Sequence, residues 1–250
     1  MTVKWLGGTN MPKYEEIANI LRERILNGTY PVDSFLPHQT ELVKEFNVSR
    51  MTIKKAVNIL TVEGLVYSKQ GMGTKILNSS FWDKDDDLYR FNQYQGLTSD
   101  FKNDERTLTS QVILFTVIFP GEEIAQRLAV DTQTPIYQII RLRLVDNQPF
   151  VLEHTYMPCD LVPGLSREIL QNSIYSYIQD ELKINFAGSY RHITAEKPYE
   201  YDQKYLHCEL TDPVLQVEQV VYLENGRPIE YSRSRNRYDA RGYSLLDVKK

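Results

Sequence analysis

Apolar residues between positions 11 and 64 recur every three or four residues, which is the period of an amphipathic helix. This pattern predicts a first helix over 12–27, which Gly28 ends. After a proline-containing connector, it predicts a short second helix over 40–46, with Thr40 as the N-cap. Both helices present an apolar side that needs a partner.

A third helix is predicted to begin after Ser49, its N-cap, and to end near Glu63. Asn47 suits the left-handed turn that separates it from the second helix. Its apolar side consists of Ile53, Ala56, Val57 and Leu60, and its polar side of Arg50, Lys54, Lys55 and Asn58. The polar side therefore carries groups that can reach phosphates and base edges.

The pattern then changes to alternation over 65–69 and 74–77, with the turn QGMG between the two segments. This predicts a small hairpin. Helices joined by a tight turn and followed by a hairpin form a winged helix-turn-helix, which binds DNA. A small helical domain whose charged side is merely solvated is the alternative reading.

From residue 93 onward the pattern mixes both periods, which indicates an α+β domain. We expect strands over 107–119, 135–158, 186–196 and 213–238, the second and fourth of these being hairpins, and helices over 121–130, 166–182 and 199–209. The two hairpins resemble each other. Each begins at a proline and turns eleven residues later, at Asp146–Asn147 and at Glu224–Asn225. This predicts a β-α-β-β unit that occurs twice and shares one sheet, with a cleft between the copies.

Charge is unevenly distributed along the 250 residues, whose net charge is −4. Residues 1–77 hold 10 Lys and Arg against 7 Asp and Glu, or +3, and the remainder holds 19 against 26, or −7. A basic head on an acidic body is consistent with local DNA contact. Residues 78–92 are polar, acidic and without period, so we interpret them as a linker.

The head resembles the GntR family of bacterial transcription regulators over residues 13–77. The resemblance rests on "I-x-N-G-x-Y" after the first helix, "LP" before the second, "F-x-V-S-R-M-T-I-K-K-A" and the wing "G-x-G-T". It implies a DNA-binding domain over 11–77. DNA contacts are implied for Ser49, Arg50, Thr52 and Lys54 on the third helix and for Lys69, Gln70, Gly71 and Gly73 at the wing.

The sequence departs from the family pattern directly after "LP". The family has Ser-Glu-Arg there, and the Arg reads a base. This chain has His38, Gln39 and Thr40, so Thr40 takes the position of that Arg. We therefore expect a changed operator.

The body resembles the ligand-sensing UTRA domain of the HutC subfamily of these regulators, whose fold is similar to chorismate lyase. The resemblance rests on "GLTSDF", "RLRLVDNQPFVLEHTYMP", "LVPGL", "NSIYSYIQDEL" and "NGRPIEYSRSRNRYD". It implies an effector-binding and dimerisation domain over 93–250. One family position near the chain's end often holds Tyr but is Asn236 here, which is expected to shift ligand specificity.

Arg141 and Arg143 alternate along one predicted strand, so both guanidinium groups lie on one face and suit a phosphate or carboxylate. Surface arginines paired with acidic residues are the alternative. The resemblance favours an anionic effector, with further contacts from Gly96, Leu97, Thr98, Ser99, Ser173 and Tyr175. Ser173 and Tyr175 could instead serve capping and core packing. Glu153 and Glu230 are candidate acceptors for sugar hydroxyls or plain surface carboxylates. Arg233 and Arg235 share a face of the last predicted strand and could join the anion site or pair with these glutamates.

No catalytic or metal-binding motif is present, and no cofactor is expected. Cys159 and Cys208 are expected to be ordinary buried residues, and a cytoplasmic location without membrane insertion fits the composition. We expect a homodimer that binds a palindromic operator in double-stranded DNA and that a phosphorylated sugar controls, most simply as a repressor. The alternatives are a small-carboxylate effector or a lyase-like enzyme fused to a DNA-binding head.

Overall fold

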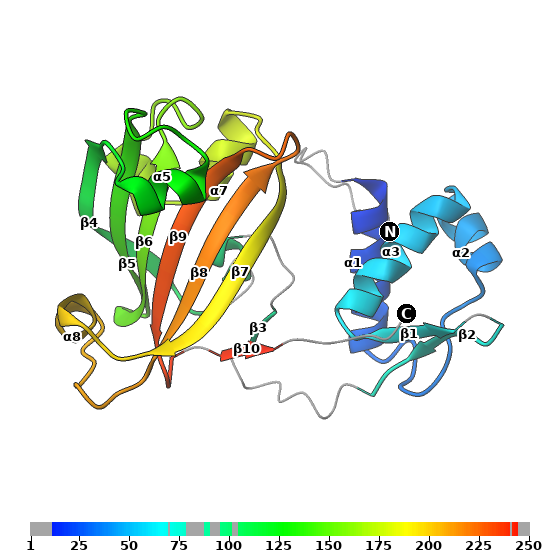
Figure 1. The fold of residues 1–250 in the computed structure, drawn as a ribbon. Coiled ribbons are helices and arrows are strands. Elements are labelled where there is room, and N and C mark those ends of the chain that lie inside the picture. The colour runs from blue at the N-terminus through cyan, green and yellow to red at the C-terminus, as the bar shows by residue number, and fades with distance from the viewer. Residues whose placement is uncertain are drawn as a thin grey trace. The chain divides into compact units, whose positions relative to one another are not determined.

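The computed structural model describes residues 12–69, 71–78, 88–90, 96–101, 105–240 and 242–244. The described residues from 12 to 78 lie in one compact unit and those from 96 to 243 in another. Within these ranges, no helix combines the length and apolar character that crossing a bilayer requires. We describe each unit separately (Figure 1).

The first unit is a three-helix core. Its helices are α1 (Lys13–Leu26), α2 (Gln39–Phe46) and α3 (Arg50–Val62). Their buried residues form one apolar cluster, to which the hairpin adds Val66 and Ile76. This confirms the predicted helices and the fold of the head. The left-handed conformation expected between α2 and α3 is found at Asn47, with φ 49°.

The predicted N-cap of α2 is wrong. The helix begins at Gln39 with His38 as its N-cap, and Thr40 lies exposed in the first turn. The Glu41 carboxylate accepts a hydrogen bond of 2.7 Å from the His38 backbone N–H. This reciprocal bond stabilises a helix start two residues earlier than the preference for a Thr cap suggests.

The wing consists of β1 (Val66–Lys69) and β2 (Gly73–Ile76), paired antiparallel. Gly71 and Gly73 have φ of 80° and 89°, which only glycine adopts without strain. Gln70 lies outside the described residues. Between the helices, Arg22 of α1 makes a bidentate ion pair with Glu63, with N–O distances of 2.8 and 2.5 Å, which fixes the end of α3 against α1.

The second unit is built on a six-stranded antiparallel sheet (Figure 1). In spatial order its strands are β4 (Leu108–Ile118), β5 (Ile136–Val145), β6 (Gln148–Pro158), β9 (Pro228–Arg237), β8 (Val214–Leu223) and β7 (Phe186–Glu196). Asp146 and Asn147 both have positive φ, as the predicted two-residue hairpin turn requires.

The sheet order confirms the internal repeat. The first copy is β4, α5 (Glu122–Leu128), β5 and β6, and the second is β7, α8 (Glu200–Tyr205), β8 and β9. The copies meet where β6 pairs with β9, so the last strand of each copy lies at the centre of the sheet and the first strand of each lies at an edge. An approximate twofold axis therefore passes between β6 and β9.

Helices cover both faces of this sheet. α5 and α8 pack on one face, against Tyr231 and against Leu152 respectively. The other face is covered by α4 (Leu97–Asp100), α6 (Arg167–Gln171) and α7 (Ile174–Ser176). The prediction of one continuous helix over 166–182 is wrong, because the helix is interrupted. Asn172 leaves the helical conformation, Ser173 caps α7, and a π-helical turn, Tyr177–Glu181, follows.

The segment interpreted as an irregular linker contains a short strand. β3 (Leu88–Arg90) pairs with β10 (Gly242–Ser244), close to the end of the chain. These three-residue strands form a separate two-stranded sheet. The alternation was too short for the sequence to reveal it.

Candidate functional site

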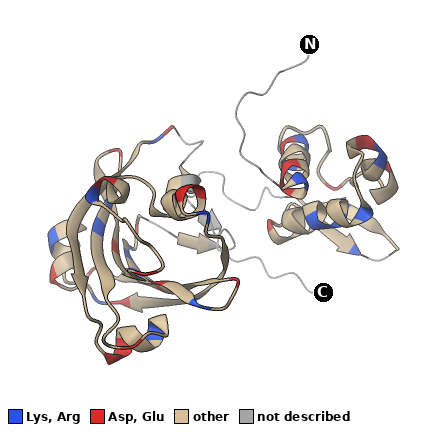
Figure 2. Cartoon of the chain, turned by 90° about the horizontal axis from the view of Figure 1, so that it is seen from above, with Lys and Arg blue, Asp and Glu red and all other residues tan. Residues whose placement is uncertain are grey.

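The candidate DNA-binding surface of the first unit centres on the start of α3. Arg50 and Lys54 are exposed on this helix, and the helix carries no acidic residue before its cap at Glu63 (Figure 2). Lys55 lies 5.3 Å from the centre of the Tyr14 ring. The basic side of α3 is therefore exposed, and its contact with DNA stays a prediction.

Ser49 and Thr52 form a local hydrogen-bonded pair. The Ser49 hydroxyl accepts from the Thr52 backbone N–H at 3.2 Å and lies 2.9 Å from the Thr52 hydroxyl. Ser49 thus caps α3, as predicted. Contact with phosphate would have to use these hydroxyls together with the exposed N–H groups of the first turn.

Gln39 connects the two helices of the motif. Its side-chain amide donates a hydrogen bond of 3.2 Å to the backbone carbonyl of Arg50. Gln39 therefore fixes the start of α3 relative to α2, a role that sequence reasoning missed. Thr40 is exposed beside it, and Lys69, Gly71 and Gly73 are exposed at the wing. Their DNA contacts stay predictions.

The candidate effector site of the second unit lies on the face that we call the arginine face, defined by Arg141, Arg143, Glu153 and Glu230. Both arginines are buried, with exposed fractions of 6% and 3%. They alternate on β5, as predicted. Their burial contradicts a surface location, although both pair with Glu153, as the alternative of arginines paired with acidic residues expected. Two guanidinium groups in the interior depend on such close polar partners.

Glu153 is shared by the two arginines. Arg141 Nη2 donates to one carboxylate oxygen at 2.7 Å, and Arg143 Nη1 lies 3.8 Å from the other. Arg141 Nη1 donates to the carbonyl of Leu170 at 3.0 Å. Within the described part of the chain the buried Nε–H of Arg141 has no acceptor.

The loop at Gly96 covers the arginines. The Thr98 hydroxyl accepts from Arg143 Nη2 at 3.1 Å, and Leu97 is buried next to it. A Cβ at Gly96 would lie only 3.1 Å from the Tyr175 ring, so the absence of a side chain allows loop and ring to touch. The Ser99 side chain lies outside the described residues.

Ser173 and Tyr175 come from the helix α7 that covers this face. The Ser173 hydroxyl accepts from the Ser176 backbone N–H at 3.1 Å, so it caps α7, as its alternative reading proposed. Tyr175 points its hydroxyl at Gln219 and Glu230. Burial, with nearby Glu230 as a further cause, raises the pKa of Tyr175 well above its ordinary value, which keeps the hydroxyl protonated.

Glu230 is buried on β9, on the same face as Glu153. Its carboxylate accepts hydrogen bonds from Ser232 at 2.7 Å and from Gln219 at 3.4 Å. Burial raises the pKa of Glu230, although these donors oppose the shift. Gln219 and Ser232 were missed, because a neutral side chain on a strand gives no signal.

Arg233 does not belong to this group. Neighbouring residues on a strand point to opposite faces, so Arg233 lies on the face of α5 and α8. There it donates to the Tyr231 hydroxyl at 2.8 Å and to Glu123 at 2.5 Å. The expectation that Arg233 joins the anion site or pairs with Glu153 or Glu230 is therefore wrong.

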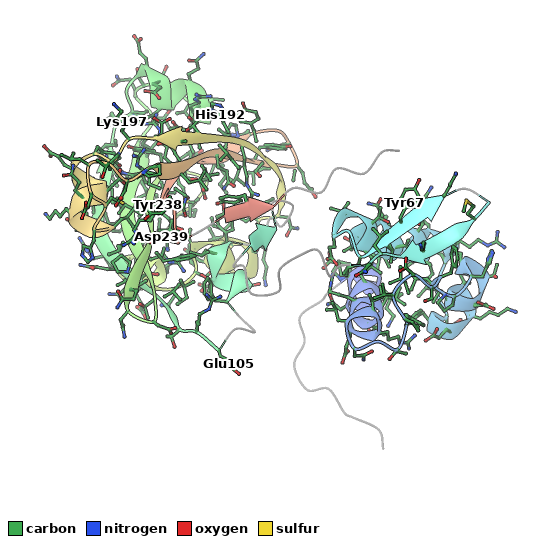
Figure 3. All side chains as sticks on the ribbon, turned by 90° about the horizontal axis from the view of Figure 1, so that it is seen from below. Tyr67, Glu105, His192, Lys197, Tyr238 and Asp239 are labelled. Carbon is green, nitrogen blue, oxygen red and sulfur yellow. The ribbon has the colours of Figure 1, made fainter. Side chains whose placement is uncertain are left out.

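Arg235 lies beside Arg233 on that opposite face. It makes a buried ion pair with Asp202 of α8 at 2.7 Å and donates to the carbonyl of Lys197, which follows β7 (Figure 3). Its guanidinium lies 4.4 Å from the centre of the Tyr199 ring. This cluster attaches α8 to the sheet, so the expectation that Arg235 joins the anion site or pairs with Glu153 or Glu230 is also wrong.

Asn236, the departure from the family's Tyr, is fully buried on the arginine face. Its amide donates to the carbonyl of Leu215 at 3.1 Å. Among the other candidate residues, Cys208 is buried and Cys159 only partly so, which corrects the expectation for Cys159. In the described ranges no group of His, Cys, Asp and Glu side chains could hold a metal ion.

Both units match known families. Residues 13–76 match the family "Bacterial regulatory proteins, gntR family", and residues 104–241 match the "UTRA domain". The chain is 46% identical over 230 residues to the HTH-type transcriptional regulator GmuR of Bacillus subtilis (strain 168), which covers 92% of this chain and 95% of that protein. It is 30% identical over 239 residues to the mannosyl-D-glycerate transport/metabolism system repressor MngR of Escherichia coli (strain K12), covering 96% and 97%.

Solved structures agree with this similarity. The crystal structure of the possible transcriptional regulator YydK from Bacillus subtilis matches with a TM-score of 0.78 and 27% identity, over 95% of this chain and all of that one. PhnF from Mycobacterium smegmatis matches with a TM-score of 0.60 and 23% identity over 94% of this chain, which supports the fold alone.

Proposed function

Since the chain belongs to the GntR family of DNA-binding bacterial transcription regulators, in the HutC subfamily that carries a UTRA domain, we propose that a phosphorylated sugar on the arginine face controls its affinity for operator DNA. Its relatives are transcription regulators rather than enzymes, so the lyase-like alternative is set aside. MngR is named as the repressor of a system for a sugar derivative, which supports a sugar-type effector and repression here.

The observation that carries this proposal is the pair of buried guanidinium groups on β5. Arg141 and Arg143 face one carboxylate, and the Thr98 loop covers them. A phosphate would accept from both guanidinium groups and from the Nε–H of Arg141, which has no acceptor among the described residues, and it would displace Glu153 from its position. A small carboxylate would use the same forks, but fewer of the polar groups near Glu230.

The DNA-binding half of the proposal uses the exposed basic side of α3 and the wing. Arg50 would make a bidentate pair with a guanine, worth about 1–3 kcal/mol of discrimination. Thr40, Ser49, Thr52, Lys54, Lys69, Gln70, Gly71 and Gly73 would supply backbone and groove contacts. Two copies of the chain, joined through their UTRA domains, would read the two halves of a palindrome in the cytoplasm.

The test compares a double variant of the arginine pair with a control on the other face. Full-length Arg141→Met/Arg143→Met should lose the thermal shift that hexose phosphates give the unaltered chain. It should still bind a duplex selected by the unaltered chain from a random pool. Arg233→Met removes a partly exposed arginine from the opposite face of the same sheet and should keep both properties.

Two results would count against the proposal. If the double variant still shows a thermal shift with hexose phosphates, the arginine face is not the effector site. An unaltered chain that responds to small carboxylates and to no phosphate would favour the alternative effector. The DNA-binding part is tested with Arg50→Ala. If this variant selects the same DNA sequence as the unaltered chain, Arg50 does not recognise a base.

A further inference from the structure

The two copies of the repeat carry different chemistry at equivalent positions. Arg141 lies five residues before the turn at Asp146, and Gln219 lies five residues before the turn at Glu224. Across the sheet Arg141 pairs with Glu153, whereas Gln219 pairs with Ser232. A cation and an anion in the first copy are thus replaced by an amide and a hydroxyl in the second. The pair of guanidinium groups on β5 therefore belongs to the first copy, and the second copy offers an amide and a hydroxyl at the positions equivalent to Arg141 and Glu153.

Arg191 sets the orientation of the Gln219 amide. Its Nε–H donates to Gln219 Oε1 at 2.5 Å, from the neighbouring strand β7. A guanidinium has donors and no acceptor, so it selects the amide oxygen. The amide nitrogen of Gln219 must then face the opposite way, toward Tyr175 and Glu230. Gln219 therefore offers only donors to the interior of the site.

The Tyr175 hydroxyl lies between a donor and an acceptor. It accepts from Gln219 Nε2 at 3.1 Å, and it is hydrogen-bonded to the Glu230 carboxylate, to which it must donate. The same Gln219 nitrogen lies 3.4 Å from Glu230 Oε1. A sugar hydroxyl is likewise donor and acceptor at once, so it could replace the Tyr175 hydroxyl bond for bond. Two neighbouring hydroxyls could use the amide and the carboxylate together.

The surroundings of Glu230 also suit a ligand that carries hydroxyl groups. It is 5% exposed, and among the described residues no Lys, Arg or His lies within ion-pair distance of it. A buried carboxylate of this kind depends on hydroxyl and amide donors. Ser232, Gln219 and Tyr175 supply them here. Of these three, Tyr175 comes from the covering helix α7 rather than from the sheet, so it is the donor that a ligand can displace.

We propose that Gln219 and Glu230, with Arg191 as the positioning residue for Gln219, form the subsite that reads neighbouring hydroxyl groups on the effector's sugar. The Tyr175 hydroxyl holds this subsite while no effector is bound. This inference rests on the proposed function, because it places the phosphate on the first copy of the repeat and the sugar hydroxyls on the second. It makes Gln219 and Arg191 determinants of sugar specificity.

The test uses isothermal titration of the full chain with two kinds of probe. Ethyl phosphate reports the anion site without hydroxyls, and a panel of hexose 6-phosphates and disaccharide 6-phosphates reports both halves. Gln219→Leu should weaken the tightest sugar phosphate at least about fivefold and leave ethyl phosphate within about twofold. Arg191→Met should do the same, and Arg191→Lys should restore most of the affinity. Tyr175→Phe should bind the sugar phosphate as tightly as the unaltered chain or more tightly.

Gln216→Leu is the matched control. Gln216 lies on the same strand as Gln219 and also accepts from an arginine, Arg235, at 2.8 Å, but on the opposite face. It should change neither affinity, and melting temperatures will show which variants fold. Equal weakening of ethyl phosphate and sugar phosphate in Gln219→Leu would overturn the inference, as would a loss of sugar phosphate affinity in Tyr175→Phe.

The outcomes also separate this inference from the proposed function. If the unaltered chain binds ethyl phosphate, and every sugar phosphate binds no more tightly than ethyl phosphate does, the hydroxyl subsite is refuted while the anion site stands. If it binds no phosphate of any kind, the proposed function itself is refuted. If Gln219→Leu does not fold, the Arg191→Met and Arg191→Lys pair decides, because Arg191 Nε–H donates directly to Gln219 Oε1.

Discussion

His154 should make the sensing domain sensitive to acid. It lies on β6, on the face of α5 and α8, and its Nε2 is 2.8 Å from the Tyr199 hydroxyl. Burial, together with the nearby Arg235 and Arg233, lowers its pKa from 6.5 to about 4, and Asp202 only partly opposes this. The folded chain therefore holds His154 neutral under conditions in which an unfolded chain would protonate it.

The sign and size of the pH effect on stability follow from the difference between the pKa values of His154 in the folded and the unfolded chain. A histidine with a lowered pKa in the folded state contributes stability that is fully present above pH 6.5 and is lost as the pH falls toward about 4. For these two pKa values, the loss between about pH 7.5 and about pH 5 is about 2 kcal/mol of unfolding free energy. Glu230 has the opposite sign, because its raised pKa favours the folded state in acid.

The assay is urea unfolding of the full chain, followed by far-UV circular dichroism at about pH 7.5 and about pH 5. His154→Gln keeps a hydrogen-bond partner for Tyr199 and cannot be protonated, so it should lose about 2 kcal/mol less than the unaltered chain between the two conditions. Comparing the two chains cancels the contribution of Glu230 and the other carboxyls. His192→Gln, which changes an exposed histidine on β7 (Figure 3), should behave like the unaltered chain. Equal losses in the unaltered chain and His154→Gln would refute the reasoning.

Two further variants test the structural framework. Asp202→Asn leaves Arg235 buried without its counter-ion and should lower the unfolding free energy of the sensing domain by about 3–5 kcal/mol. Asp239→Asn affects an exposed ion pair with Arg237 and should change this free energy by less than about 1 kcal/mol. Urea unfolding measures both. Ser49→Ala removes the N-cap of α3 and should cost the head about 1 kcal/mol, seen as a lower melting temperature, while Ser68→Ala in the exposed wing should have little effect.

Much of the head could be predicted because its signals are local. Helix period, the cap at Ser49, the turn at Asn47 and the glycines of the wing each depend on a few neighbouring residues. The error at Thr40 has the same origin. The preference for Thr as a cap is a statistical one, and here it was outweighed by the bond between Glu41 and the His38 backbone.

In the sensing domain the repeat was predictable and the covering helices were not. The turn at Asp146–Asn147 and its counterpart at Glu224 mark two similar hairpins, and similar hairpins that share a sheet impose the observed strand order. The break between α6 and α7 was invisible because apolar residues continue at helical spacing through Asn172. The backbone leaves the helix there, and Arg141 donates to the carbonyl of Leu170, a contact between distant segments.

The side on which a strand residue points decides which charged residues can form a site, and the sequence leaves that choice open. β9 carries Glu230 and Ser232 at even positions and Arg233 and Arg235 at odd positions, so either set could face an effector. The choice is made by the pairing of β9 with β6, which places Ser234 opposite Glu153 and thereby puts the even positions on the arginine face. A slip of one residue would exchange the two sets, so that Glu230 would lie on the face of α5 and α8 while Arg233 and Arg235 joined Arg141. The specificity of the proposed site is therefore fixed by the register at the centre of the repeat, a contact between segments about 80 residues apart.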